Sequence, residues 1–251
     1  MQQRSEAWYR ERAGRITGSR FSRAMAPRNS DAYLGLISEL AEERKAGHSR
    51  DGGYVNAAMQ WGIDHEPAAR KWYVRQHGHR VSEIGFVVHS MHSFVGVSPD
   101  GLVGDDGLIE IKCPQMKGFR QVMSTQEMPS RYRWQVQGQL WVCQRDWLDF
   151  VCFYPPGQGI AIRIEGDDND FDRLEARCIE VNREVEKRVG IGGRPQAPAT
   201  SRAPRQKPST PSLPPQWTQS RHEPAKPVTS FDIPWWVWAV VVIVVILWLS
   251  H

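Results

Sequence analysis

Two predicted short strands carry Asp100 at the start of one and both Glu110 and Lys112 within the other. Asp100 lies in a Ser-Pro-Asp-Gly turn, and a Gly-Asp-Asp-Gly turn at 104–107 reverses the chain so that Glu110 returns beside it. The second strand reads Ile-Glu-Ile-Lys, so Glu110 and Lys112 share one face while the two isoleucines point to the opposite, buried face. One face of the hairpin therefore presents an acid and an amine together.

Two carboxylates beside a lysine are the groups that a metal-dependent nuclease requires. Asp and Glu oxygens are hard ligands that suit Mg²⁺, and the ion neutralises charge that develops on a phosphodiester. Lys112 then positions or deprotonates the attacking water. A Glu-x-Lys motif alone is short, and a solvent-facing pair on a surface hairpin is the alternative that it leaves open.

Five segments occur in a fixed order over about residues 5 to 188. They are Glu6-Ala7-Trp8 with Arg12 to Ser19, Trp61-Gly62 with Glu66, Ser98 to Gly101, Glu110 to Pro114, and Tyr132 with Gln135-Val136-Gln137 and Trp141-Val142. In these segments the chain resembles the PD-(D/E)xK nucleases, and within them the YqaJ-like viral recombinases of the lambda-exonuclease type. Five ordered segments are far more specific than one short motif.

The resemblance implies that the Mg²⁺ ligands are Asp100, Glu110 and the backbone carbonyl of Ile111. Lys112 is then the catalytic lysine. Glu66 matches a helix-borne carboxylate that binds a second ion directly or through water, and Mn²⁺ is expected to substitute for Mg²⁺. Gln135 matches a glutamine on a later helix whose amide orients the lysine or the water. An ordinary polar helix position is the alternative for Gln135.

The resemblance also implies a pocket for the 5′-phosphate of a DNA end, made by Arg12, Thr17, Ser19 and Ser98. Arginine suits phosphate because its fork is planar and always charged, and hydroxyls at a predicted helix start act together with backbone N–H groups. Simple N-capping by Thr17 or Ser19 is the alternative.

One position departs from the family pattern. Gly118 stands where the lambda-type enzyme has another phosphate-binding arginine, and Lys117 and Arg120 are the nearby substitutes. The residues for recognition of the DNA end therefore match the family pattern less fully than those of the metal site.

Periodicity predicts an α/β fold with a mixed sheet, and the resemblance implies that this is a restriction-endonuclease-like core in which helices flank the central sheet. Helical patterns cover 32–45, 55–77, 130–144 and 170–188, with Glu66 midway along the second and Pro67 positioned to kink or restart it. Residues 80–112 predict a meander of short strands, and alternation near 148–154 and 160–164 predicts two half-buried strands.

Cysteines and histidines give no sign of a transition-metal site. The four cysteines form no C-x-x-C pair, so we expect free thiols in the core and no iron–sulfur cluster. His77 with His79, or His89 with His92, lack matching partners for zinc, and loop or surface positions are expected for them.

Composition divides the chain into a nuclease domain at 1–189, a Pro-rich basic flexible linker at 190–231 and a C-terminal transmembrane anchor at 232–251. The run from Ile233 to Leu249 has no charge and tryptophans at both ends, as an interfacial belt requires. Basic residues on the linker side predict a cytoplasmic nuclease domain, tail-anchored in the inner membrane of the host cell. A docking peptide for a partner and a buried terminal helix are the alternatives.

The combined prediction is a Mg²⁺-dependent exonuclease that degrades one strand of linear double-stranded DNA from its 5′ end. A net charge of +4 fits an acidic polymer as partner. The resemblance implies a homotrimer and a single-strand annealing protein that takes the 3′ overhang. A structure-specific endonuclease of the same fold and an inactive, membrane-anchored DNA-binding protein are the alternatives.

Overall fold

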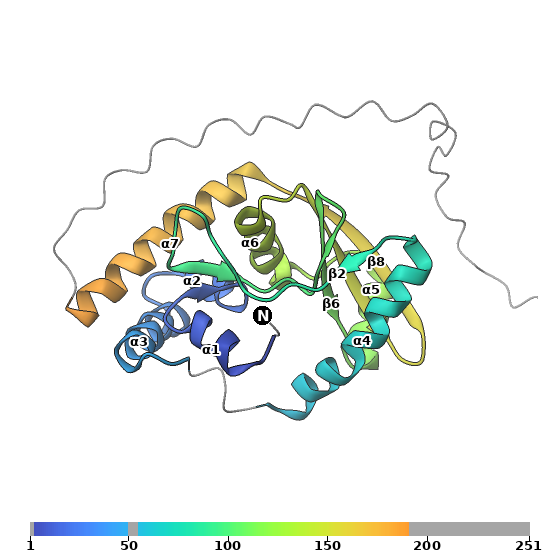
Figure 1. The fold of residues 1–251 in the computed structure, drawn as a ribbon, viewed down its shortest axis with the longest axis horizontal. Helices are drawn as coiled ribbons and strands as arrows, with labels where there is room; N and C mark the ends of the chain where they lie inside the picture. The colour runs from blue at the N-terminus through green and yellow to red at the C-terminus, as the bar shows by residue number, and fades with distance from the viewer. Residues whose placement is uncertain (1–2, 50–54, 191–251) are drawn as a thin grey trace, which may run out of the picture. The chain divides into compact units, whose positions relative to one another are not determined.

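A five-stranded mixed sheet forms the centre of the protein in the computed structural model, which describes residues 3–49 and 55–190 (Figure 1). In spatial order its strands are β2 (Val81–Ser82), β5 (Gly101–Val103), β6 (Gly107–Lys112), β7 (Trp147–Tyr154) and β8 (Gln158–Glu165). Strands β6 and β7 run parallel and the other neighbours run antiparallel. A smaller sheet joins β1 (Ile16–Thr17), β4 (Val95–Val97) and β3 (Val87–Val88). The predicted mixed α/β architecture is confirmed.

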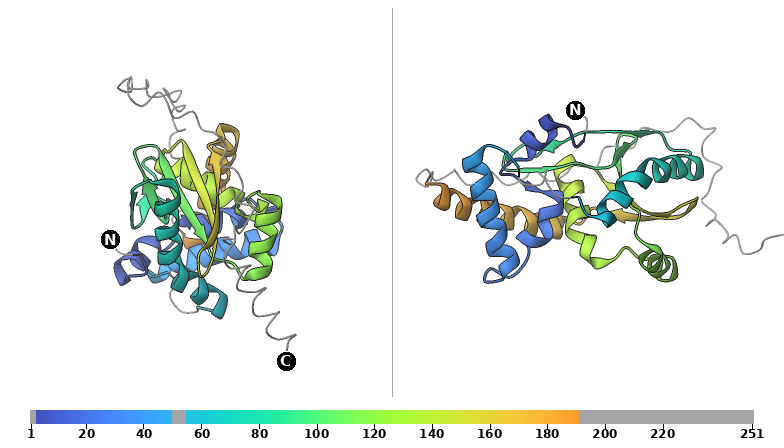
Figure 2. Two further views of the ribbon diagram at one scale, coloured as in Figure 1. Left: turned by 90° about the vertical axis from the view of Figure 1, so that its right-hand side faces the viewer. Right: turned by 90° about the horizontal axis from the view of Figure 1, so that it is seen from below.

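Helices flank the sheet much as the periodicity predicted. The α-helices are α1 (Glu6–Arg12), α2 (Phe21–Ala24), α3 (Asp31–Ala46), α4 (Ala57–His77), α5 (Met116–Thr125), α6 (Arg133–Cys143) and α7 (Asp168–Val189). Single 3₁₀ turns, η1 (Gly18–Arg20) and η3 (Ser130–Tyr132), precede α2 and α6. Helix α4 continues through Pro67 without a restart. Helices α3 and α7 pack side by side toward one end of the described part, and α4 lies toward the other (Figures 1 and 2).

Two apolar clusters lie on the two faces of the sheet. The larger joins Leu108, Leu148 and Phe150 to residues of α3, α6 and α7. The smaller joins Ile109, Ile111 and Val151 to Trp72 and Tyr73 of α4, so that both isoleucines of the Ile-Glu-Ile-Lys strand are buried as predicted.

Strand β7 is buried on both faces, and the prediction that it is half-buried is wrong. The reason is α4, which covers the face that alternation alone assigns to solvent. Asp149 on that face is paired, because Tyr73 donates its hydroxyl to Oδ2 over 2.6 Å and Arg163 donates to Oδ1 over 2.9 Å. Asp149 is therefore buried rather than solvated, and its hydrogen bonds to Tyr73 and Arg163 compensate for the loss of water.

The proline-rich linker from residue 191 onward and the predicted membrane anchor at 232–251 lie outside the described residues. Among the helices that the structure does describe, none is long and apolar enough to cross a membrane.

Candidate active site

Asp100 lies where the chain enters β5, beside the second half of β6. The antiparallel register pairs Gly101 with Ile109, and Oδ2 of Asp100 accepts a hydrogen bond of 2.7 Å from the backbone N–H of Ile111. Gly104, at φ +55°, lies in the turn that reverses the chain. The hairpin therefore returns Glu110 and Lys112 to the neighbourhood of Asp100, as its turn residues predicted.

Glu110 is the centre of a buried hydrogen-bond network. Its Oε1 accepts from Nζ of Lys112 at 2.5 Å and from Nε2 of Gln135 at 2.6 Å. Its Oε2 accepts from Nε2 of Gln139, also at 2.6 Å, and the Glu110 residue is only 2% exposed. Every oxygen of this carboxylate thus has a donor, and the surface-hairpin alternative is excluded.

The charges of the site perturb one another. Desolvation, followed by the nearby carboxylates of Glu110 and Glu66, raises the pKa of Asp100 well above its ordinary value. Desolvation alone would lower the pKa of Lys112, but Glu110 and Asp100 outweigh it and raise that pKa above its ordinary value. Asp100 therefore lies among carboxylates whose charge Lys112 does not fully offset.

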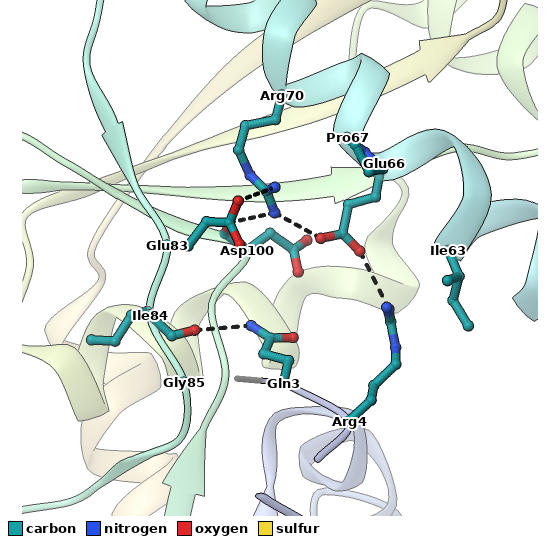
Figure 3. Close-up of a pocket in the computed structure, with 10 residues that line it drawn as sticks. All are labelled: Gln3, Arg4, Ile63, Glu66, Pro67, Arg70, Glu83, Ile84, Gly85 and Asp100. Atoms are coloured by element: carbon teal, nitrogen blue, oxygen red, sulfur yellow. Dashed lines mark hydrogen bonds and ion pairs between the residues drawn. The ribbon is translucent and has the colours of Figure 1, made fainter. Parts of the chain in front are cut away.

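Glu66 approaches from α4 and lines a cavity of about 630 Å³ together with Asp100 (Figure 3). Its Oε1 accepts from Arg70 at 2.7 Å, four residues further along the helix, and its Oε2 accepts from Arg4 at 3.3 Å. Arg70 also donates to the backbone carbonyl of Asp100 at 3.1 Å. Arg70 thus connects the helix-borne carboxylate to the hairpin.

The donor chemistry of this site suits a hard divalent cation. Three carboxylates influence one another at Asp100, and a cation would relieve the repulsion that raises its pKa. Within residues 3–49 and 55–190, however, no three His, Cys, Asp or Glu side chains converge on one point. The reason is that arginines hold Glu66 and that Lys112, Gln135 and Gln139 hold Glu110. Metal binding requires Glu66 to release an arginine, whereas Oε2 of Glu110 accepts from Gln139 and keeps a second lone-pair site for an ion.

The residues predicted to bind the 5′-phosphate come together around β1 and β4. Trp8 donates its indole N–H to Oγ of Ser98 at 2.8 Å, and the Arg12 guanidinium stacks 4.1 Å above the Trp8 ring. Oγ1 of Thr17 lies 3.4 Å from Oγ of Ser19. Parallel pairing of β1 with β4 places this segment beside the strand that leads to Ser98.

Exposure divides these four residues. Thr17 is fully buried and Arg12 is 8% exposed, whereas Ser19 is exposed and Ser98 half-buried. Thr17 makes no side-chain cap to the 3₁₀ turn that follows it, which removes the N-capping alternative for that residue. Ser19 and Ser98 are therefore the most accessible members of the group.

The cluster and the carboxylate site adjoin each other. A side chain at Gly18 would meet Val97 and Gln135, so the turn after Thr17 lies against the helix that holds Glu110. Lys117 and Arg120 are both exposed on α5, a helix that periodicity did not predict.

Sequence reasoning missed Gln139 and Trp8, and it considered Arg70 only as a residue that could face a DNA backbone, without its contact with Glu66. Gln139 and Arg70 each follow a predicted site residue by four positions on the same helix, a spacing that places side chains on one face. Helical spacing from Gln135 and Glu66 was therefore the signal. Trp8 belongs to a segment that the resemblance covered, but no pattern indicated that it would bind Ser98.

The four cysteines are free thiols, as predicted, with Cys143 half-buried and the other three buried. His89 and His92 lie in a loop, as predicted, and both are buried there. Nδ1 of His89 lies 3.1 Å from the Met91 backbone nitrogen, and Nε2 of His92 lies 2.6 Å from Glu175. Both histidines are thus part of the packing around Trp141.

Comparison with known proteins gives a consistent result. A family model described as the YqaJ-like viral recombinase domain matches residues 7–146. The alkaline exonuclease LHK-Exo from Laribacter hongkongensis is 34% identical, with a TM-score of 0.69 over 74% of this chain and 95% of that chain. A second structure of LHK-Exo, in complex with dAMP, matches with a TM-score of 0.70. A phage related exonuclease from Haemophilus somnus 129PT shares the fold at 15% identity, with a TM-score of 0.57 over 70% of this chain and 96% of that chain. None of the curated proteins compared matches the chain.

Proposed function

The chain belongs to the YqaJ-like viral recombinase family and is a nuclease of the phage exonuclease type, and from this premise we propose that it is a Mg²⁺-dependent 5′-to-3′ exonuclease on linear double-stranded DNA. The observation that carries the proposal is the arrangement of Lys112, Gln135 and Gln139 around Glu110, next to Asp100. It is the group of residues that metal-assisted phosphodiester hydrolysis needs.

Asp100, Glu110 and Glu66 would hold Mg²⁺, with the Ile111 carbonyl as a further ligand, and bound ions supply Lewis acidity and neutralise the developing charge. Lys112 donates to Glu110 and has a raised pKa, so it is protonated at neutral pH. Its N–H groups would orient the attacking water. Gln135 and Gln139 keep the Glu110 carboxylate in place throughout.

Water attacks phosphorus, the bond from phosphorus to the 3′ oxygen breaks, and the leaving oxygen takes up a proton. The products are a 5′-mononucleotide and a strand shortened by one residue that again carries a 5′-phosphate. The structure of LHK-Exo with dAMP supports a site that accepts a mononucleotide. Repeated cycles leave a 3′ overhang.

The end specificity follows from the second cluster. Ser19 and Ser98, supported by Arg12 and Trp8, lie beside the helix that carries Gln135. A 5′-phosphate bound there would place the first phosphodiester bond near Asp100 and Glu110. Thr17 then supports this cluster from the interior.

The overhang would be the substrate of a single-strand annealing protein, and a homotrimer that encloses the DNA is the proposed assembly. The membrane anchor at 232–251 remains a sequence prediction. It would tether the nuclease domain to the cytoplasmic face of the inner membrane.

The deciding experiment compares the protein with its Lys112→Ala variant on linear duplexes that carry a 5′-phosphate or a 5′-hydroxyl, and on closed circles, with and without Mg²⁺. Nucleotide release from linear DNA alone, faster with the phosphate and lost in Lys112→Ala, is the expected result. Cutting of closed circles would indicate an endonuclease instead. DNA binding without Mg²⁺-dependent cleavage would indicate an inactive tether.

A further inference from the structure

The segment that precedes α1 passes over the cavity shared by Glu66 and Asp100. Gln3 fixes it there, because its Nε2 donates to the backbone carbonyl of Pro99 at 2.9 Å and to that of Ile84 at 3.2 Å. Figure 3 shows Arg4 extending from this anchor to Glu66, with Arg70 approaching the same carboxylate from a different side. Arg4 lies outside residues 7–146, which the family model matches.

The backbone of Arg4 is in an unfavourable conformation for a side chain of its kind. Its φ is +65°, a region that favours glycine. Within the described residues, the other non-glycine positions with positive φ are Gln126 and Gln144, and each of them ends a helix in the left-handed cap that helices commonly use. Arg4 ends no helix, so its conformation points to a function of the side chain.

The two arginines on Glu66 are held very differently. Arg70 has a 16% exposed side chain and also contacts Glu83 at 2.8 Å and the Asp100 carbonyl at 3.1 Å. Arg4 has a 44% exposed side chain, and its contact to Glu66 is longer, at 3.3 Å. Arg4 is therefore the partner that Glu66 releases most easily.

The charge of the cavity determines when Glu66 releases Arg4. The cavity lining carries two arginines and three carboxylates, an excess of one negative charge when all are ionised. A divalent cation turns that excess into one positive charge, so the same cavity repels a phosphate without the ion and attracts one with it. An ion on Glu66 also repels the Arg4 guanidinium.

We propose that Arg4 binds a backbone phosphate of the DNA strand, and that in the free protein Glu66 occupies Arg4 in place of that phosphate. When Glu66 takes up the metal ion, the guanidinium is released at the edge of the cavity, where its planar fork suits a phosphate of the strand that enters the site. The inference rests on the proposed function, because it requires a divalent cation on Glu66.

The test compares Arg4→Gly with Arg10→Ala. Glycine removes the guanidinium and suits the positive φ, so this variant is expected to fold. Arg10→Ala removes one positive charge from a nearby exposed pair with Glu6 and serves as the matched control. Mg²⁺ binding to the free full-length protein is measured by calorimetry. Duplex binding with Mg²⁺ is measured as a function of salt, with Lys112→Ala added to every variant to stop cleavage.

Arg4→Gly is expected to bind Mg²⁺ about two- to fivefold more tightly, because a weak internal competitor is gone. It is expected to bind the duplex about three- to tenfold more weakly, with a salt slope smaller by about 0.9. Arg10→Ala changes neither quantity by a comparable amount.

Tighter Mg²⁺ binding with unchanged DNA binding would overturn the phosphate role. Weaker DNA binding with unchanged Mg²⁺ binding would overturn the exchange on Glu66. Arg4→Gly behaving like Arg10→Ala in both assays would overturn the whole inference. A wild-type protein that binds no Mg²⁺ and cleaves no DNA would instead overturn the proposed function, and this result is visible before any Arg4 variant is made.

Discussion

Nε2 of Gln139 lies 2.6 Å from Oε2 of Glu110, and the Oε1 atom of the same amide is buried without a hydrogen-bond partner in the described structure. The amide cannot be reversed, because Oε1 would then face the carboxylate. A buried unpaired carbonyl costs about 1–3 kcal/mol. Gln139 is 1% exposed, so water does not reduce this cost. The hydrogen bond to Glu110 is the contact that the unpaired carbonyl accompanies.

Replacing Gln139 with Met keeps the volume and removes the donor to Glu110. We expect a loss of stability of about 1–3 kcal/mol from the Glu110 oxygen that loses its donor, offset in part because the unpaired carbonyl leaves with the amide. We also expect a lower rate and an increase of several-fold in the Mg²⁺ concentration for half-maximal activity. A Mg²⁺ titration of nucleotide release measures both.

Gln137→Met is the matched control on the same helix. Gln137 donates to the Glu165 carbonyl at 2.9 Å and accepts from the Asp167 backbone at 2.9 Å, so both ends of its amide are satisfied away from the site. Its loss is expected to cost about 1–3 kcal/mol of stability with no change in the Mg²⁺ requirement. An unaltered Mg²⁺ requirement in Gln139→Met would show that the contact with Glu110 is only structural.

Trp8→Phe tests the phosphate cluster. Phenylalanine keeps a ring for the Arg12 guanidinium to stack on but cannot donate to Ser98, so Ser98 loses the partner that orients it. A hydrogen bond of this kind contributes about 1 kcal/mol, or roughly fivefold in rate. We expect the preference for a 5′-phosphate over a 5′-hydroxyl end to fall by about that factor.

The measurement is the ratio of initial rates on the two ends, which cancels any general loss of activity. Tyr9→Phe, on the adjacent position of α1, is the control and should leave the ratio unchanged. Equal rates on both ends in the wild type would remove the basis of the end-recognition hypothesis.

The sequence predicted the hairpin of Asp100 and Glu110 well because the signals there are local. Turn residues fixed the reversal, and a period of two fixed the face of Lys112. The predicted helices at 32–45 and 170–188 match α3 and α7 for the same reason, since each has an apolar stripe and a glycine just after its end.

Other features depend on how helices and strands pack against one another, and local sequence patterns do not encode this packing. Strand β7 is buried on both faces because α4 returns across it, and Asp149 is an interior acid only because Tyr73 and Arg163 reach it from other elements. Arg4 and Glu66, which are in contact, are 62 residues apart in the sequence. Spacing along one helix would have revealed Gln139, whereas the position of Arg4 could not be derived from any pattern in its own segment.

Glu180 links α7 to the segment around α3, and it is expected to make the protein sensitive to acid. The Arg28 hydrogen bond, aided by Tyr33 and Arg177 against a desolvation penalty, lowers the pKa of Glu180 to about 2 from 4.5. The native state thus binds fewer protons than the unfolded state between these values, and stability falls as pH falls through that window.

Glu180→Gln should lower the melting temperature at pH 7, and the difference from wild type should shrink below pH 4.5 and vanish near pH 2. Thermal unfolding across this range measures it. Glu184→Gln, which removes an exposed contact with Lys187, is the control and should give a small effect. A difference that stays constant from pH 7 to pH 2 would contradict the assignment to Glu180.

Asp100 is expected to show the opposite dependence, because desolvation and its carboxylate neighbours raise its pKa well above the ordinary 3.8. Between the two values the native state binds more protons than the unfolded state, so the metal-free protein loses stability as pH rises through that window. Asp100→Asn keeps an acceptor for the Ile111 N–H and removes the charge. In EDTA it should therefore melt a few degrees above wild type at pH 8 and show no advantage below pH 3.8.

Mg²⁺ should reverse that order. The ion offsets the repulsion only where Asp100 is present, so it should raise the melting temperature of wild type much more than that of Asp100→Asn, which should also be inactive. Asp105→Asn, in the exposed turn of the same hairpin, is the control and should behave like wild type with and without the ion. If Asp100→Asn melts below wild type in EDTA at pH 8, Asp100 is a stabilising acid in the free protein. That result would contradict the hypothesis that repulsion among the carboxylates favours cation binding at this site.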